Sequence, residues 1–133
     1  MSVSNHILTT TYTAAGTIDQ YRIVKFGSSD NTVIEAIAAT DRLVGVAYIP
    51  GVSGTQKVSG DRLEVVLSGV AELKAGGTIT RGDLVTSDAN GQAVVAAPGA
   101  GVNNQAIGKA LVSALSGDVF PVLLAPQQIQ GAA

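Results

Sequence analysis

Hydrophobic and polar residues alternate in short runs along much of the chain, with the period of two that β-strands show. In Leu63-Glu64-Val65-Val66-Leu67, residues 63, 65 and 67 share one face, because successive side chains of a strand point to opposite sides. Phe120, Val122 and Leu124 follow the same phase near the end of the chain. We therefore predict that these six side chains are buried on equivalent faces of two strands.

Turn signals separate the apolar runs. Ser28-Ser29-Asp30-Asn31 and Asp88-Ala89-Asn90-Gly91 lie at corresponding places, and a Ser-Gly-Asp triplet precedes both Leu63 and Phe120. Asn and Gly accept a positive φ, which suits tight hairpins. Sixteen glycines and turn signals roughly every ten residues predict an all-β protein, a small barrel or sandwich of the β-tulip kind.

The order of segments in the first half recurs in the second, which indicates an internal duplication. The matching segments are Gly16-Thr17-Ile18 with Gly77-Thr78-Ile79, Val33-Ile34 with Val94-Val95, Val44-Gly45-Val46-Ala47 with Ile107-Gly108-Lys109-Ala110, and Ser59-Gly60-Asp61 with Ser116-Gly117-Asp118. The first and second of these need no gap between them. We place the single duplicated β domain at residues 16–125, with halves at about 16–70 and 77–125.

Three segments have no counterpart in this repeat. Residues 1–15 are rich in threonine and predict an extended N-terminal arm, mobile in the free protein, whose removal would leave the melting temperature nearly unchanged. The loop of residues 50–55 adds six residues to the first half. Residues 126–133 carry several glutamines and predict a loose C-terminal tail.

Composition excludes several classes of function. A chain of 133 residues is one domain by length, and its apolar residues are mostly Ala and Val. The net charge is −2 and the eight basic residues are scattered, so we expect no nucleic acid as partner. Without cysteine the chain has no disulfide and no thiolate metal site. No apolar run is long enough to cross a membrane, and we expect no membrane partner and synthesis in the cytoplasm.

The chain carries few residues suited to catalysis. His6 is the only histidine and lies in the expected arm, and no Asp, Glu and His cluster has the spacing of metal ligands. Asp61 and Asp118 could form a shared-proton dyad if duplication brought them together, but each follows Ser-Gly, where Asp caps a turn. We read Arg81-Gly82-Asp83 as a turn as well. The sequence thus predicts no catalytic, cofactor-binding or metal-binding residue, and no enzyme.

Several segments resemble a known family. They are Leu67 to Leu73, Gly77 to Ala93, Ile107 to Leu111 and Ser116 to Leu124. Together they are similar to the small capsid cement proteins, or head decoration proteins, of tailed bacteriophages. In the first half Tyr21-Arg22-Ile23 stands where that pattern has Arg-Gly-Asp-Leu. The resemblance implies a β-rich domain, usually trimeric, that sits outside the capsid, clamps neighbouring major capsid subunits and has no catalytic residues.

We therefore expect a structural protein of the virion that decorates the capsid exterior, with the phage major capsid protein and further copies of itself, as a homotrimer, for partners. The alternatives are a tail-associated β protein, a small carbohydrate-binding β module, and a hydrolase using Asp61 and Asp118. The residues expected to contact the capsid or a neighbouring subunit are Ile7, Leu8, Thr10, Tyr12, Gly51, Val52 and Ser53.

Overall fold

The computed structural model describes residues 4–131, which form β-strands joined by turns and, within that range, no helix. The all-β prediction is therefore confirmed. The strands are β1 (Asn5–Ala14), β2 (Ile18–Asp19), β3 (Ile23–Phe26), β4 (Thr32–Glu35), β5 (Leu43–Tyr48), β6 (Gln56–Lys57), β7 (Arg62–Lys74), β8 (Leu84–Ser87), β9 (Ala93–Val95), β10 (Asn103–Ala110) and β11 (Val119–Gln130).

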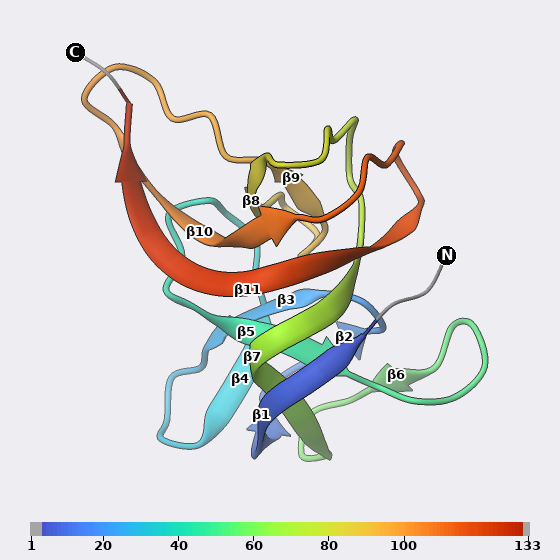
Figure 1. Cartoon of the computed structure of the whole chain (residues 1–133). Helices are drawn as coiled ribbons and strands as arrows, with labels where there is room; N and C mark the ends of the chain where they lie inside the picture. The colour runs from blue at the N-terminus through green and yellow to red at the C-terminus, as the bar shows by residue number, and fades with distance from the viewer. Residues whose placement is uncertain (1–3, 132–133) are drawn as a thin grey trace.

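Nine of the strands form one sheet in the order β1-β4-β3-β5-β7-β11-β10-β8-β9, and β2 and β6 pair separately. β7 lies at the centre of this order and β1 runs alongside it (Figure 1). An additional antiparallel pairing between β1 and β7 joins the start of the order to its middle. The successive pairings β1–β4, β4–β3, β3–β5, β5–β7 and β7–β1 thus return to their starting strand. We call this closed set of strands the first ring.

The C-terminal part of β7 begins a second closed set. It pairs with β11, β11 pairs with β10, β10 with β8 and β8 with β9. A parallel bridge between Ala75 and Ala93 then connects β9 back to the end of β7. We call these strands the second ring. Residues 62–70 of β7 pair with β1 of the first ring and residues 70–74 pair with β11 of the second, so one long strand holds the two rings together.

The two rings have the same pairings. Val24 lies opposite Gly45 in the first ring, as Val85 lies opposite Gly108 in the second. A Cβ on Gly45 would overlap the carbonyl oxygen of Val66, and one on Gly108 would overlap that of Leu123. The shared glycine therefore has a steric reason, since the neighbouring backbone approaches too closely for any other residue.

The turns at the ring ends also correspond. Ala14 donates to the carbonyl oxygen of Asp61 at 2.7 Å, and Ala75 donates to that of Asp118 at 2.7 Å. The backbone of Gly60 donates to the carbonyl oxygen of Ala14, and that of Gly117 donates to the carbonyl oxygen of Ala75, each at 2.8 Å. Ala14 thus occupies the place of Ala75, although residues 9–13 and 70–74 share no amino acid position by position.

This correspondence corrects the expected N-terminal arm. Residues 5–14 are not an extension outside the domain but strand β1, paired with β7 along its length and with β4 at Thr13 and Ala14. Residues 9–13 of β1 hold the place in the first ring that residues 70–74 of β7 hold in the second. The amino acids gave no sign of this, because the equivalence rests on backbone pairing, which a threonine run satisfies as well as Val-Ala-Glu-Leu. Residues 1–3 lie outside the described range.

Two further expectations change. Phe26 pairs with Val33 and Ser87 with Ala93, so Val33 corresponds to Ala93 rather than to Val94. The first turn is one residue longer, and the gap-free alignment was wrong by one position there. Residues 126–130 continue β11 and pair with β10 instead of forming a loose tail, and this ribbon runs out towards the C-terminus (Figure 1).

The core has two clusters of buried side chains. One fills the first ring with Ala14, Ile18, Val24, Val33, Val44, Ala47, Ile49, Leu63 and Val65. The other fills the second ring and continues onto the outer side of the first ring at Ile23, Ala36, Val46 and Val66. Of the six strand residues predicted to be buried, Leu63, Val65, Phe120, Val122 and Leu124 are buried, and Leu67 is partly buried.

Candidate functional site

The expected contact residues lie on β1 and on the loop between β5 and β6. Ile7 is 75% exposed and Val52 is 81% exposed, and Leu8 and Thr10 are also exposed. Gly51 and Ser53 lie in the exposed loop, whereas Tyr12 is only partly exposed and packs against the core of the first ring. Ile7 and Val52 are thus accessible to a partner, while Tyr12 is only partly so.

Ile7 is exposed because β1 bulges there. His6 pairs with Gly69 and Leu8 with Ser68, which leaves Ile7 without a partner in the strand register. Gly69 has φ of +102°, and a Cβ at that position would overlap the carbonyl oxygen of Asn5. Glycine at residue 69 thus permits the bulge, which turns the Ile7 side chain outward.

The other edge of β1 is largely unpaired. β4 pairs with β1 at Thr13 and Ala14, and within the described residues no strand pairs with residues 5–12 on that side. A free edge presents backbone donors and acceptors to which another chain can add a strand. Thr9, Thr10 and Thr11 lie along this edge, and β-branched residues favour extended pairing.

The loop from Pro50 to Thr55 is an ordered insertion. Gln20 is buried, and its side-chain nitrogen donates to the carbonyl oxygens of Ile49 and Gly51 at 2.9 and 3.3 Å. The side-chain oxygen of Gln20 accepts a hydrogen bond from Gly54 at 3.2 Å. Sequence reasoning missed Gln20. Its only signal in the sequence was a polar side chain between the apolar residues Ile18 and Ile23. Its three bonds hold Val52 outward at the loop tip.

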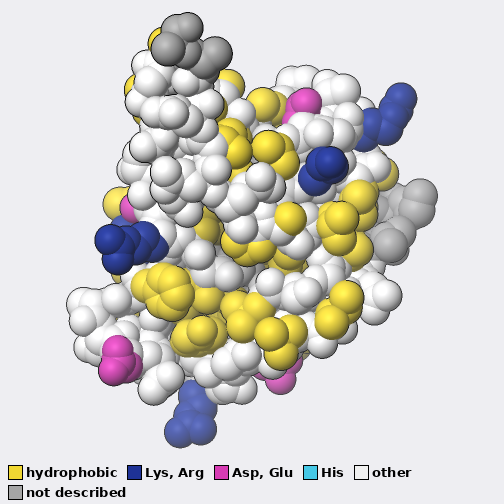
Figure 2. All heavy atoms as spheres, turned by 60° about the vertical axis from the view of Figure 1, so that its left-hand side comes forward, with side chains coloured by type: hydrophobic (Ala, Val, Ile, Leu, Met, Phe, Trp, Pro, Cys, Tyr) yellow, Lys and Arg dark blue, Asp and Glu magenta, His cyan; other side chains and the backbone are white. Residues whose placement is uncertain are grey.

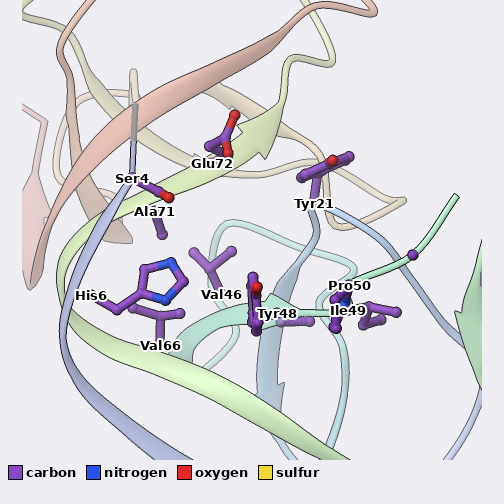
Figure 3. A pocket seen from close by; sticks show the side chains of 12 residues that line it. Ser4, His6, Tyr21, Val46, Tyr48, Ile49, Pro50, Val66, Ala71 and Glu72 are labelled. Carbon is purple, nitrogen blue, oxygen red and sulfur yellow. The ribbon is translucent and has the colours of Figure 1, made fainter. Parts of the chain in front are cut away.

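A cavity of about 330 Å³ separates the start of β1 from this loop (Figure 3). His6 from β1 and Tyr48 from β5 meet edge to face across it, with ring centroids 5.0 Å apart. Pro50, Tyr21 and Glu72 also line the cavity. Of the expected contact residues Gly51 lines this cavity, whereas Ile7, Leu8, Thr10 and Val52 do not.

The aspartates considered for catalysis act in turns. The carboxylate of Asp61 accepts a hydrogen bond from the backbone of Val58 at 2.9 Å, and that of Asp118 accepts one from Leu115 at 3.0 Å. Asp83 does the same for Thr80 at 2.9 Å, so the Arg81-Gly82-Asp83 segment is a third turn of this kind. The turn interpretation is confirmed for all three. Among residues 4–131, no three His, Cys, Asp or Glu side chains gather closely enough to hold a metal ion.

Glu35 is the carboxylate whose environment changes its titration. Burial raises its pKa above the ordinary value of 4.5, against a hydrogen bond from the backbone of Asp19 that lowers it. Glu35 lies between the rings, since a side chain at Gly91 of the second ring would contact it. The carboxylate belongs to the joint between the rings and not to the candidate contact surface.

On the face seen in Figure 2 the apolar side chains reach the surface in groups, while most charged side chains stand apart from them. Grouped apolar side chains of this kind are common at protein contact surfaces. The family model described as phage cement protein matches residues 2–125. This chain belongs to the phage cement protein family. The family resemblance seen in the sequence is thereby confirmed.

Structural comparison agrees on the fold of this cement protein. The crystal structure of the head fibre gp8.5 N base of bacteriophage phi29 superposes with a TM-score of 0.61 at 20% identity. The match covers 89% of this chain and 93% of that one. A comparison with curated proteins gave no match. Among the described residues there is no helix that could span a membrane.

Proposed function

We propose that this cement protein is a non-enzymatic decoration protein that binds the outside of a phage head and stabilises contacts between major capsid subunits. The observation that carries the proposal is the family match over residues 2–125. The solved neighbour is itself a head fibre, which favours the head over the tail as the binding place. On this proposal the protein is made in the host cytoplasm and ends on the capsid exterior.

The surface that we assign to capsid contact combines β1 and the inserted loop. Ile7 and Val52 supply exposed apolar anchors, and Leu8, Gly51 and Ser53 lie next to them in the chain. The free edge of β1 supplies backbone groups for strand addition by a capsid segment. Many identical weak contacts of this kind around a head give a strong attachment in sum.

We also infer how the domain is built. The equivalent pairings and turns of the two rings support an internal duplication, with each ring a small barrel and β7 shared between them. A self-associating unit, most simply a homotrimer, would present several copies of the contact surface to the capsid lattice at once. Thr10 and Tyr12 lie at the end of the first ring and are assigned to the contact with a second copy.

Cosedimentation with undecorated heads tests the proposal. The purified protein should pellet with heads at saturable occupancy and raise the temperature at which heads release DNA, while tails should pellet without it. Binding to tails and not to heads would favour a tail-associated protein. Pelleting with insoluble polysaccharide alone would favour a carbohydrate-binding module instead.

Substitutions on the contact surface test which residues make the contact. Ile7→Asp and Val52→Asp should leave the melting temperature within about 2 °C, because neither side chain is buried. Each should weaken head binding about tenfold or more if these residues are anchors. The matched control is Leu115→Asp, since Leu115 is 65% exposed but lies in the turn before β11. Equal occupancy for all three variants would remove β1 and the loop from the contact.

A deletion separates the loop from the fold. Removing Gly51 to Gly54 should leave the domain folded, at a cost of about 1–3 kcal/mol, because Gln20 loses two of its three partners. Head occupancy should fall. Thermal melting checks the fold, and quantitative gel analysis of pelleted heads checks occupancy. Unchanged occupancy would show that the loop is a tolerated insertion.

A further inference from the structure

The contact between the two rings joins two different kinds of surface. On the first ring it uses the outer side, where Ile23, Ala36, Val46 and Val66 are at most 2% exposed. On the second ring it uses one end of the strand set, where Ala71, Leu73, Ser87 and Leu124 are buried. Backbone bonds from Ile23 to Gly91 at 2.8 Å and from Lys74 to Tyr21 at 3.0 Å fix this side-to-end contact.

Because the rings have the same pairings, each also carries the surface that the other uses. The side of the second ring that corresponds to Ile23, Ala36, Val46 and Val66 presents Leu84, Ala96, Lys109 and Leu123. None of these four is buried, and Leu123 is 43% exposed. Three of the four positions remain apolar, although Leu84 and Ala96 are only partly buried and Leu123 is exposed.

The end of the first ring corresponds to the buried end of the second ring. The positions that correspond to Ala71, Leu73, Ser87 and Leu124 hold Thr10, Tyr12, Phe26 and Leu67. Phe26 is 56% exposed, and Tyr12 and Phe26 line one shallow hollow. In the second ring the equivalent end is closed by the first ring, whereas in the first ring it is open.

We propose that a second copy of this chain closes the open end, with Tyr12, Phe26 and Leu67 of one copy packed on Leu84 and Leu123 of the next. The occupant follows from the internal contact, which joins the same two surfaces within one chain. This inference rests on the proposed self-association of the decoration protein and names its interface. The contact is heterologous, because it joins two different surfaces. It therefore gives a closed cyclic oligomer if the rotation between copies allows closure, and a filament otherwise.

On the side of the second ring, Lys109 is the one polar replacement, because it stands where the first ring has Val46. A charged side chain at this place weakens a contact that would otherwise be as apolar as the internal one. The copies should therefore associate more weakly than the rings of one chain, and Lys109→Val should tighten association.

Analytical ultracentrifugation of the full chain and of two variants tests the proposal. Phe26→Asp places a charge on the open end of the first ring, and Leu123→Asp places one on the corresponding side of the second ring. Both side chains are exposed, so we expect both variants to fold. Each variant alone should be a monomer, with association weakened about 10- to 100-fold or more. The control Leu115→Asp should associate as the unchanged chain does.

Mixing the variants gives the decisive result. Phe26→Asp keeps an intact side and Leu123→Asp keeps an intact end, so an equimolar mixture should form a one-to-one dimer and no larger species. Circular dichroism confirms that each variant is folded. A mixture that stays monomeric, a variant that still assembles alone, or an unchanged chain that is monomeric up to its solubility limit would each overturn the proposal.

Head binding separates this inference from the proposed function. If the variants fail to pair as described but the unchanged chain still pellets with heads, the decoration function stands and the interface is wrong. If the variants pair and the unchanged chain does not pellet with heads, the interface stands and the decoration function is wrong.

Discussion

The two rings are built from the same pairings and differ in what covers them. The end of the second ring is buried against the first, and small or apolar residues fill it: Ala71, Leu73, Ser87 and Leu124. The same end of the first ring carries Thr10, Tyr12, Phe26 and Leu67 and faces solvent in part. One backbone arrangement thus serves as a core in one place and as a surface in the other.

This difference shows where function can reside in a protein with so little chemistry. Backbone pairing gives both rings the same architecture. The side chains, which pairing does not constrain, decide whether the end of a ring is buried or exposed. The first ring holds the bulge at Ile7, the inserted loop and the open end, while the second ring holds the largest buried side chain, Phe120. In the proposals above, the first ring carries the capsid contact and the open end, and the second ring contributes Leu84 and Leu123 to the contact between copies.

Removing β1 should have the largest effect on this comparison. Deleting residues 5–14 takes one strand from the first ring, exposes Leu63, Val65 and their neighbours, and should leave the protein unfolded or aggregated. This reverses the expectation that the N-terminal segment is dispensable for melting. Circular dichroism and size-exclusion chromatography check it. A cooperative transition within a few degrees of the full chain would restore the mobile-arm interpretation.

Substitutions at two equivalent positions, one buried between the rings and one exposed, test this difference in burial directly. Val66→Asp places a charge between the rings and should cost more than about 3 kcal/mol. Leu123→Asp changes the corresponding residue of the second ring and should cost less than about 1 kcal/mol, because that side chain is exposed. Urea unfolding measures both. Similar costs would mean that the two sides are covered alike.

The glycine turns give a smaller effect. Gly117 has φ of +94°, and a Cβ at this position would meet no neighbouring atom within 4 Å, so Gly117→Ala tests backbone conformation alone. The expected cost is about 1–2 kcal/mol. Gly99→Ala is the control, since its nearest neighbour would be Val102 at 3.8 Å and no unusual φ is required. A cost for Gly99→Ala equal to that for Gly117→Ala would contradict the conformational explanation.

Glu35 should give the smallest effect, and its sign follows from its raised pKa. The folded state holds the proton more tightly than the unfolded state, so this group favours folding below its ordinary pKa of 4.5 and loses that contribution as pH rises through the folded pKa. Glu35→Gln should therefore raise the melting temperature slightly at pH 7 and not at pH 4. The exposed Glu64→Gln serves as control. A loss of stability for Glu35→Gln at pH 7 would contradict this sign.

Part of the structure could be predicted because local patterns express it. The alternation at Leu63, Val65 and Phe120, Val122 places these residues inside, and the Ser-Gly-Asp triplets give the turns in which Asp61 and Asp118 accept backbone bonds. Sequence similarity also identified the family. These features depend on residues close together in the chain, where side-chain period and turn chemistry act directly.

The candidate contact surface was only partly accessible to the same reasoning. Ile7 and Val52 could be named as contacts because they are apolar residues in polar surroundings, and both are exposed. Their positions depend on Gly69, which allows the bulge, and on Gln20, which anchors the loop. Gly69 and Gln20 lie far along the chain from the segments that they position, so no local pattern connects them.

Residue order alone was enough to predict the all-β class, the turns, the phase of the buried faces and the family. Three features emerged only in the folded chain: residues 5–14 are a strand of the first ring, the first turn shifts the alignment by one residue, and one ring covers the end of the other. The physical reason is that backbone hydrogen bonds are almost indifferent to side-chain identity. Thr9 to Thr13 and Val70 to Lys74 can therefore hold the same place in two rings while the amino acids give no sign of it.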